Sequence, residues 1–172
     1  MTSRNPDLIA AITRMQGLDG LLIRTGIQGT EASARKDTRQ DDGSISADPE
    51  LSLVEVAVDL EYGNKQRRIP EYAPYRRCAE ADGPRWLAAL ATRVKAYAAS
   101  KDAAKFAKGL REVALATVND IKATITETDT PPNSQYTIDR KGSDGVLRDT
   151  GQFLNSQRSE IVIPGSAPFP AA

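Results

Sequence analysis

The feature that most constrains the fold is an apolar stripe in the second half of the chain. Side chains there recur three or four positions apart, the spacing that places them on one face of an α-helix. The segment "SKD" precedes the stripe, where Ser100 suits the helix cap, and "ETDTPPNS" ends it. The stripe consists of Phe106, Leu110, Val113, Ala114, Thr117, Ile121 and Ile125. We therefore predict a long amphipathic helix that packs on a core.

A second helix is expected directly before the first, from residue 84 to about residue 99. Pro84 suits the first turn, where a missing N–H costs no hydrogen bond. The apolar residues that follow it have helical spacing, and they are Trp86, Leu87, Leu90, Val94 and Tyr97. At this spacing the aromatic rings are expected in the core rather than on a stacking surface.

Shorter elements are expected on both sides of these helices. Residues 51–62 fit a helix that begins near Ser52 or Asp48 and stops at Gly63, although alternation at its start leaves a strand open. Other patterns predict a helix at 6–16, a strand at 21–27, a helical turn within 135–144, a short helix at 149–155 and a strand at 158–163. This mixture indicates an α+β class, with a single domain over 1–163 in which long central helices pack with a small, mostly antiparallel sheet.

Three stretches are expected to be irregular. Residues 28–50 contain one branched apolar residue, Ile45, and three basic against six acidic residues, so we predict a long polar loop. Residues 64–83 contain two prolines and a basic excess. The last segment, 164–172, contains three prolines and is expected to form an extended arm.

The composition removes most catalytic chemistry. The 172 residues include no histidine and one cysteine, so Ser-His and Cys-His pairs and the usual zinc ligand sets are excluded. No glycine-rich phosphate-binding motif is present. Lys+Arg and Asp+Glu both number 23, so no overall charge attracts nucleic acid or an anionic membrane. We expect no enzyme, no cofactor and no membrane partner, and we expect Cys78 to be a buried, small apolar residue.

The acidic residues near the expected loop do not have the spacing of a calcium site. The segment "DTRQDDGSISADPE" departs from the Asp-x-Asp-x-Asp-Gly order with a closing glutamate. A solvated loop or an interface arm is therefore favoured over a metal site. The residues concerned are Asp37, Asp41, Asp42, Asp48 and Glu50.

Five basic residues lie close together after residue 63, and two interpretations stay open. They face DNA or an acidic partner, in which case phosphate contact would be sequence-blind and salt-dependent. Alternatively, they belong to a solvated segment and pair with Asp59, Glu61 and Glu71. The five are Lys65, Arg67, Arg68, Arg76 and Arg77.

The segment "GVLRDTGQFLNSQ" (145–157) has the pattern of a capped helix start. Asp149 or Thr150 is expected to accept a free N–H, and Gly151 permits a tight turn. The apolar pair Phe153 and Leu154 is expected to be buried. By itself this pattern fits a helix that merely joins a loop to the last strand. The motif residues are Leu147, Asp149, Thr150, Gly151, Phe153, Leu154, Asn155 and Ser156.

Two blocks of the chain resemble the virion-morphogenesis and tail-completion proteins of tailed bacteriophages. "RKGSDGVLRDTGQFLNSQRSEIVI" (140–163) is similar to that family's Asp-Thr-Gly turn, Leu-rich helical turn, Asn-Ser and closing strand, and "PPNSQYTIDRKGSD" is similar to the run before it. "VEVAVDLEYGNKQRRIPEYAPYRRCAEAD" resembles the family's helix ending in Glu-aromatic-Gly, followed by Ile-Pro. Pro74 and Tyr75 fill the family's proline and aromatic positions, whereas its arginine there is absent.

The resemblance implies a structural role at the head–tail junction of a virion assembled in the host cytoplasm. It implies a ring of identical copies, a hexamer first and a dodecamer as the alternative, that joins the tail to the head-side connector. Expected partners are portal-proximal proteins and the tail terminator or tube, with DNA passing through the channel without sequence-specific contact. Residues 28–50, 64–77 and the C-terminal arm would make the ring contacts, around a rigid helix pair at 84–125. The alternative is a nucleic-acid-binding module that uses residues 64–77.

Overall fold

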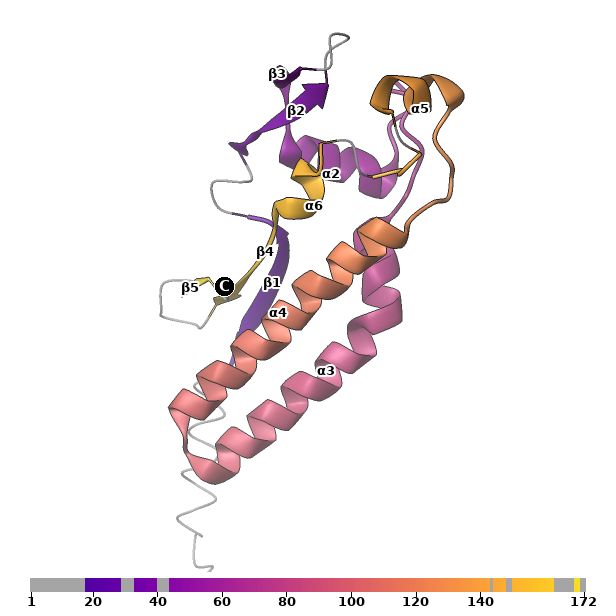
Figure 1. Cartoon of the computed structure of the whole chain (residues 1–172). Helices are drawn as coiled ribbons and strands as arrows, with labels where there is room; N and C mark the ends of the chain where they lie inside the picture. Colours follow the sequence, from indigo (N-terminus) through magenta and orange to yellow (C-terminus); the bar gives the residue numbers. More distant parts are fainter. Residues whose placement is uncertain are drawn as a thin grey trace, which may run out of the picture. The chain divides into compact units, whose positions relative to one another are not determined.

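The computed structural model describes residues 18–28, 33–39, 44–142, 144–147, 150–162 and 169–170. The expected helix at 6–16, Asp149 and most of the C-terminal arm lie outside this part of the chain. The α+β class is confirmed (Figure 1). The elements are β1 (Leu22–Ile27), β2 (Arg35–Arg39), β3 (Ile45–Ser52), α2 (Leu53–Tyr62), α3 (Pro74–Ser100), α4 (Ala103–Glu127), α5 (Gln135–Lys141), α6 (Gln152–Asn155), β4 (Gln157–Val162) and β5 (Phe169–Pro170).

The strands form two small sheets, and the chain forms two compact units. One sheet has the order β1-β4-β5, with β4 and β5 antiparallel, and the other pairs β2 with β3 in antiparallel fashion. Unit 1 comprises Met1–Thr25, Pro84–Thr117 and Ser159–Ala172, and unit 2 comprises Gly26–Gly83 and Val118–Arg158. Both α3 and α4 therefore contribute residues to each unit.

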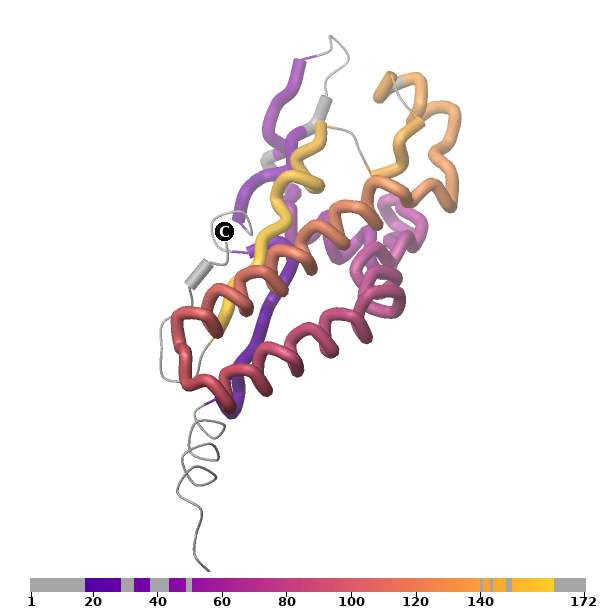
Figure 2. The backbone as a smooth tube through the Cα atoms, turned by 60° about the horizontal axis from the view of Figure 1, so that its bottom comes forward, coloured from indigo at the N-terminus to yellow at the C-terminus, as the bar shows by residue number. Residues whose placement is uncertain are grey.

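The core of unit 1 forms where the second half of α3 lies beside the first half of α4 (Figures 1 and 2). Its buried cluster consists of Phe106, Leu110, Ala114 and Ile161. The Tyr97 ring stacks on Phe106 with centroids 4.5 Å apart. The predicted stripe of α4 is confirmed at every position, since all seven of its residues are buried.

The start of α3 was predicted wrongly, because the helix begins at Pro74 and not at Pro84. Pro74 takes the first helical position, and Pro84 lies inside the helix, where it removes one backbone hydrogen bond. The helix continues through it because both flanks are anchored: Cys78 is fully buried on one side, as predicted, and Tyr97 stacks on the other. Leu87, predicted in the stripe, is 69% exposed.

Side chains cap the first turns of α2 and α4, and the cap of α4 differs from the prediction. The oxygen of Ser52 caps α2 in a capping box with Glu55, and Gly63 ends the helix, as predicted. The backbone hydrogen bond from Ser52 lowers the pKa of Glu55. Ser100 does not cap α4, because it is the last residue of α3; Oδ1 of Asp102 instead accepts from the Lys105 N–H at 2.9 Å.

The polar loop predicted over 28–50 is also wrong, since this stretch contains β2 and most of β3. Asp37 pairs with Ala47 and Arg35 pairs with Ser52. A step of two residues along β2 therefore matches a step of five residues along β3. Pro49, which has no N–H to pair, lies in this irregular part. The charged, apolar-poor composition that suggested a loop therefore belongs to a hairpin with a register shift. Asp41 and Asp42 lie outside the described residues.

Candidate functional site

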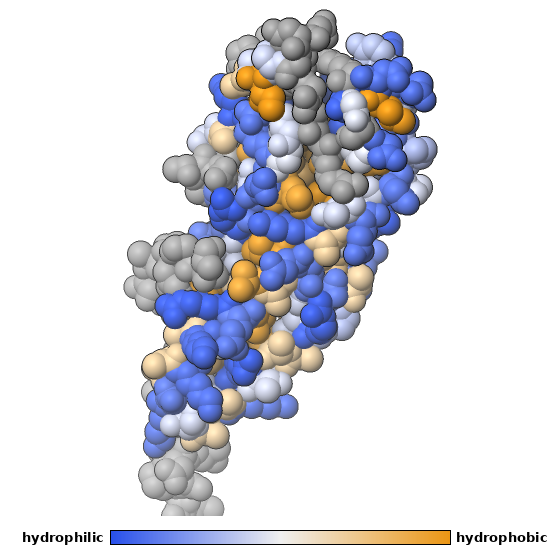
Figure 3. Space-filling view, in the orientation of Figure 1, coloured by the Kyte–Doolittle hydropathy of each residue, from blue (hydrophilic) through white to orange (hydrophobic). Residues whose placement is uncertain are grey.

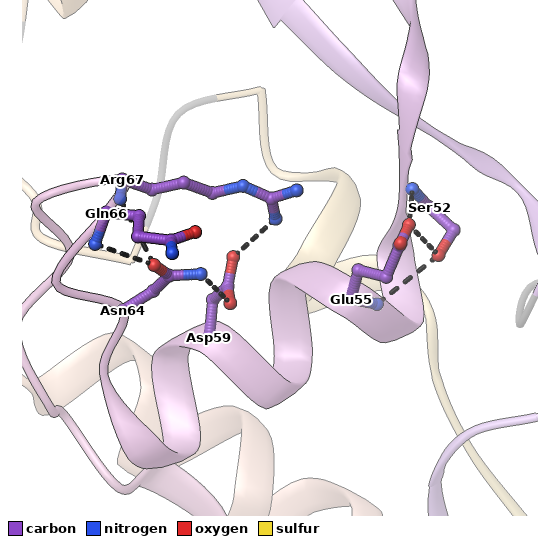
Figure 4. A network of polar contacts seen from close by, with 6 residues as sticks. All are labelled: Ser52, Glu55, Asp59, Asn64, Gln66 and Arg67. Carbon is purple, nitrogen blue, oxygen red and sulfur yellow. Dashed lines mark hydrogen bonds and ion pairs between the residues drawn. The ribbon is translucent and has the colours of Figure 1, made fainter.

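Two buried carboxylates of α2 organise the segment that carries the predicted basic residues. Asp59 is 8% exposed, and its oxygens accept from Nδ2 of Asn64 at 2.7 Å and from Nη1 of Arg67 at 2.6 Å (Figure 4). Oδ1 of Asn64 accepts in turn from the backbone N–H groups of Gln66 and Arg67. The hydrogen bond to Asp59 raises the pKa of Arg67, so the guanidinium stays charged. The network fixes the turn after α2.

The second carboxylate, Glu61, caps α3 from another helix. Its two oxygens accept from the N–H groups of Tyr75 at 3.0 Å and Arg76 at 3.1 Å. These are the second and third residues of α3, whose free N–H groups a cap residue normally satisfies. Ala73 precedes the helix and has no side-chain acceptor. Glu61 therefore stabilises a start of α3 at Pro74.

The five predicted basic residues fall into two groups. Arg67 pairs with Asp59 and Arg76 pairs with Glu71, which agrees with the interpretation of a segment held by its own ion pairs. The hydrogen bond to Glu71 raises the pKa of Arg76. The other three are exposed, and within the described part of the chain their side chains form no ion pair: these are Lys65, Arg68 and Arg77.

The motif of residues 147–156 forms a buried turn, and its cap differs from the prediction. Gly151, in the left-handed region at φ 76°, occupies the cap position of α6 and offers no side-chain cap; Oγ1 of Thr150 accepts weakly from the Gln152 N–H at 3.3 Å. Phe153 is buried, as predicted, and Leu154 is half-buried. Ser156 ends the turn by donating to the Gln152 carbonyl at 2.6 Å. The remaining described members are Leu147, which is buried, and Asn155, which is exposed.

The motif packs against the start of α3. The rings of Tyr75 and Phe153 meet edge to face, with centroids 6.3 Å apart. The Tyr75 hydroxyl donates to Oε1 of Gln157 at 3.0 Å, and Nε2 of Gln157 donates to the Phe153 carbonyl at 2.8 Å. Gln157 is 1% exposed, and these two hydrogen bonds satisfy both the oxygen and the nitrogen of its side-chain amide within the protein. Burial raises the pKa of Tyr75 to about 12, which keeps the hydroxyl protonated as a donor.

Gln152 connects the motif to the hairpin. Its Oε1 accepts from the Asp37 N–H at 2.7 Å, and its Nε2 donates to the Arg35 carbonyl at 2.8 Å. An N–H and a carbonyl two residues apart on one strand are what a neighbouring strand would bind. The side-chain amide of Gln152 thus replaces one peptide group of a third strand beside β2.

Unit 2 also contains a groove between the turn after α2, the motif and α5. One pocket of about 480 Å³ is lined by apolar side chains that include Leu60, Tyr72 and Phe153. A second pocket of about 440 Å³ adjoins it, since the two share Arg68 and Tyr72 among other residues. Figure 3 shows isolated hydrophobic residues among mostly hydrophilic ones on the face of the molecule that it draws.

The most connected polar residues of this site were not predicted as such. The sequence pattern indicates Glu61 only as a partner of arginines, and it indicates no role for Gln152 or Gln157. Pro74, a residue that suits the first helical position, was the available signal for the start of α3. Nothing in the sequence marked the two glutamines, because their partners lie 115 and 82 residues away.

The described residues contain no group of three His, Cys, Asp or Glu side chains placed to hold a metal ion. No helix in the same part of the chain combines the length and the apolar composition that crossing a bilayer requires. In comparisons with known proteins, no protein-family model, no curated protein and no solved structure matches this chain.

Proposed function

We propose that the chain is a structural subunit of a bacteriophage neck, a tail-completion protein that forms a ring at the head–tail junction. One observation carries the proposal: the two blocks with the family resemblance are in direct contact. Tyr75, from the first block, packs on Phe153 and donates to Gln157, both from the second. This shared buried contact gives the two blocks a common structural role, which is a reason for both of them to occur in one chain.

The chemistry of the motif supports assembly rather than catalysis. The polar groups of Gln152, Ser156 and Gln157 are engaged in hydrogen bonds to the protein itself. Such groups are positioned to hold elements together and have little capacity left for a substrate. The motif therefore serves to fix the hairpin and α3 in one arrangement, from which partner proteins are contacted.

Exposed apolar residues on α2 support contact with other proteins. Val54, Val58 and Tyr62 lie four residues apart, on one face of the helix, and are 38%, 51% and 68% exposed. A row of this kind is typical of interaction surfaces. In a ring, each copy would place one surface against a different surface of its neighbour.

The test combines the mass of the purified protein in solution with electron microscopy of a lysate from phage lacking it. We expect rings, hexamers first and dodecamers as the alternative, or monomers that assemble only on tails, together with separate heads and tails in the defective lysate. Normal head–tail joints in that lysate would contradict the proposal.

A nucleic-acid-binding module is the second candidate, because Lys65, Arg68 and Arg77 are exposed on one segment. It requires a monomer that binds DNA of any sequence, with an affinity that falls steeply as salt rises. A substitution of Arg77 by glutamate should then weaken DNA binding and reduce the salt dependence. A neck protein would instead keep its assembly when DNA is absent.

A further inference from the structure

The groove of unit 2 has a charge pattern that selects its ligand. Its lining includes four cationic side chains, Lys36, Arg67, Arg68 and Lys141, and one carboxylate, Asp37. Arg67 is neutralised by Asp59, and the ammonium of Lys141 donates to the carbonyls of Gly145 and Val146. Lys36 and Arg68 form no ion pair within the described residues. An anionic ligand therefore finds two available cations at the edge of an apolar groove.

Arg68 occupies a backbone position that does not favour arginine. Its φ is 56°, in the left-handed region, within the turn closed by the two hydrogen bonds between Asn64 and Ile69. Glycine or asparagine is the usual residue at such a position, since a larger side chain is strained there. An arginine at this place therefore costs some backbone strain, and strained positions of this kind cluster at binding sites.

The position of Arg68 indicates what it is needed for. It lines both pockets, as do Ile69, Pro70 and Tyr72, so it lies where the two halves of the groove meet. A guanidinium at this point can form a bidentate pair with a carboxylate, while apolar side chains of the same ligand enter the pockets on either side.

We propose that this groove binds an extended acidic peptide segment of a partner protein, with Arg68 recognising a carboxylate between apolar side chains. A peptide fits better than a nucleic acid because the apolar part of the lining is largely aliphatic. Its aromatic side chains, Tyr72 and Phe153, are 6% and 8% exposed, so their rings offer no open stacking surface. The proposal does not depend on the virion role.

The test uses the full chain and short synthetic peptides in which leucine or phenylalanine alternates with aspartate or glutamate. Matched peptides with lysine in place of the acids, and an oligothymidylate, serve as comparison ligands. We expect the acidic peptides to bind and the lysine peptides not to bind. Arg68→Glu should weaken acidic-peptide binding by about 10- to 100-fold, as the loss of a charge-assisted hydrogen bond does.

Two further variants separate recognition from stability. Arg68→Gly relieves the backbone strain, so it should unfold at the same or a higher temperature while losing peptide binding. Lys65→Glu makes the same charge change as Arg68→Glu in the same turn, at an exposed residue that lines neither pocket. It should leave acidic-peptide binding within about twofold of the wild type, a small change in free energy.

Four results would overturn the proposal. The first is that the folded protein binds no acidic peptide, and the second is that Arg68→Glu and Lys65→Glu weaken acidic-peptide binding equally. The third is that oligothymidylate binds with the same dependence on Arg68. The fourth is that Arg68→Glu converts a wild-type oligomer into monomers. The third would assign the groove to nucleic acid, and the fourth would assign it to a second copy of the chain. Peptide binding is measured on isolated protein, so its failure is distinct from a failure of ring assembly.

Discussion

Unit 1 and unit 2 are stabilised by different kinds of contact. The centre of unit 1 is an apolar cluster of Phe106, Leu110, Ala114 and Ile161. Unit 2 also buries apolar side chains, such as Leu53, Ile125 and Phe153. Its elements are joined in addition by buried polar side chains, Glu61 and Gln157 among them, whose partners are backbone groups and a tyrosine hydroxyl. Apolar packing tolerates approximate shape, whereas a buried polar network is stable only when each member keeps its partner. The residues that specify a unique arrangement are therefore concentrated in unit 2.

The most severe test of this difference places charges in the buried turn of unit 2. Phe153→Asp combined with Leu154→Asp would bury at least one carboxylate without a cation, which costs several kcal/mol, comparable to the whole stability of a domain. We expect loss of folding in circular dichroism and thermal unfolding. If the variant folds but lacks the head–tail joining expected of the proposed neck protein, these side chains belong to an interface instead.

Packing in unit 1 should be sensitive to volume alone. Leu110 is 1% exposed, so Leu110→Ala should leave a cavity and lower the free energy of unfolding by about 2–5 kcal/mol. Leu115→Ala on the same helix, where the side chain is 47% exposed, is the control and should change it much less. Urea unfolding of both variants gives the comparison. Equal effects would mean that the cluster is not the core of unit 1.

Unit 2 should lose stability at alkaline pH through Tyr75. Its pKa is about 12 in the folded protein and about 10 in an unfolded chain, so the folded state favours the protonated hydroxyl. The contribution is fully present below pH 10 and is lost as pH rises to 12, a decrease of about 2–3 kcal/mol. Tyr75→Phe should be less stable than the wild type at neutral pH and should show a smaller alkaline decrease. Identical pH profiles for the two proteins would contradict the buried contact.

Removing the cap of α3 should act locally. Glu61→Ala leaves the N–H groups of Tyr75 and Arg76 without their acceptor and should cost about 1–3 kcal/mol. The control is Glu112→Ala, which removes an exposed carboxylate paired with Arg93 in unit 1 and should cost at most about 1 kcal/mol. Hydrogen exchange should show faster exchange in the first turn of α3 for the first variant only.

The smallest effect is expected at the hairpin. Gln152→Ala removes both side-chain hydrogen bonds to β2 and should lower stability by about 1–2 kcal/mol. Hydrogen exchange at the Asp37 amide should become faster, because that N–H loses its acceptor. Gln66→Ala, at an exposed residue of the same unit, should leave this amide unchanged. Unchanged protection in Gln152→Ala would show that the glutamine does not hold β2.

The elements predicted correctly are those whose cause is local. The stripe of α4 is set by spacing within the helix, and α2 is bounded by Ser52 and Gly63 through contacts a few residues apart. The errors occur where distant residues decide. Pro84 matched a local rule for helix starts, but Pro74 matched it equally well, and the Glu61 carboxylate that caps the first turn after Pro74 is a contact from another helix.

The candidate site divides in the same way. The motif itself was recognisable from its residues, and burial of Phe153 followed from the apolar pair in a capped turn. The exposed state of Arg68 and the ion pair of Arg67 were not separable in the sequence, because adjacent arginines are chemically identical there. The tertiary structure separates them, because Asp59 accepts from Arg67, whereas Arg68 forms no ion pair within the described part of the chain and lines both pockets.

By itself, the sequence determined the α+β class, the long helix with its buried stripe, and the absence of imidazole chemistry, since these depend on residue types and short-range periodicity. Only the tertiary structure decided that a polar, proline-containing stretch forms the β2–β3 hairpin, that Gln152 binds β2, and that Gln157 joins Tyr75 to the motif. The physical reason is that a strand edge and a buried amide are satisfied by partners far along the chain, which no local pattern encodes.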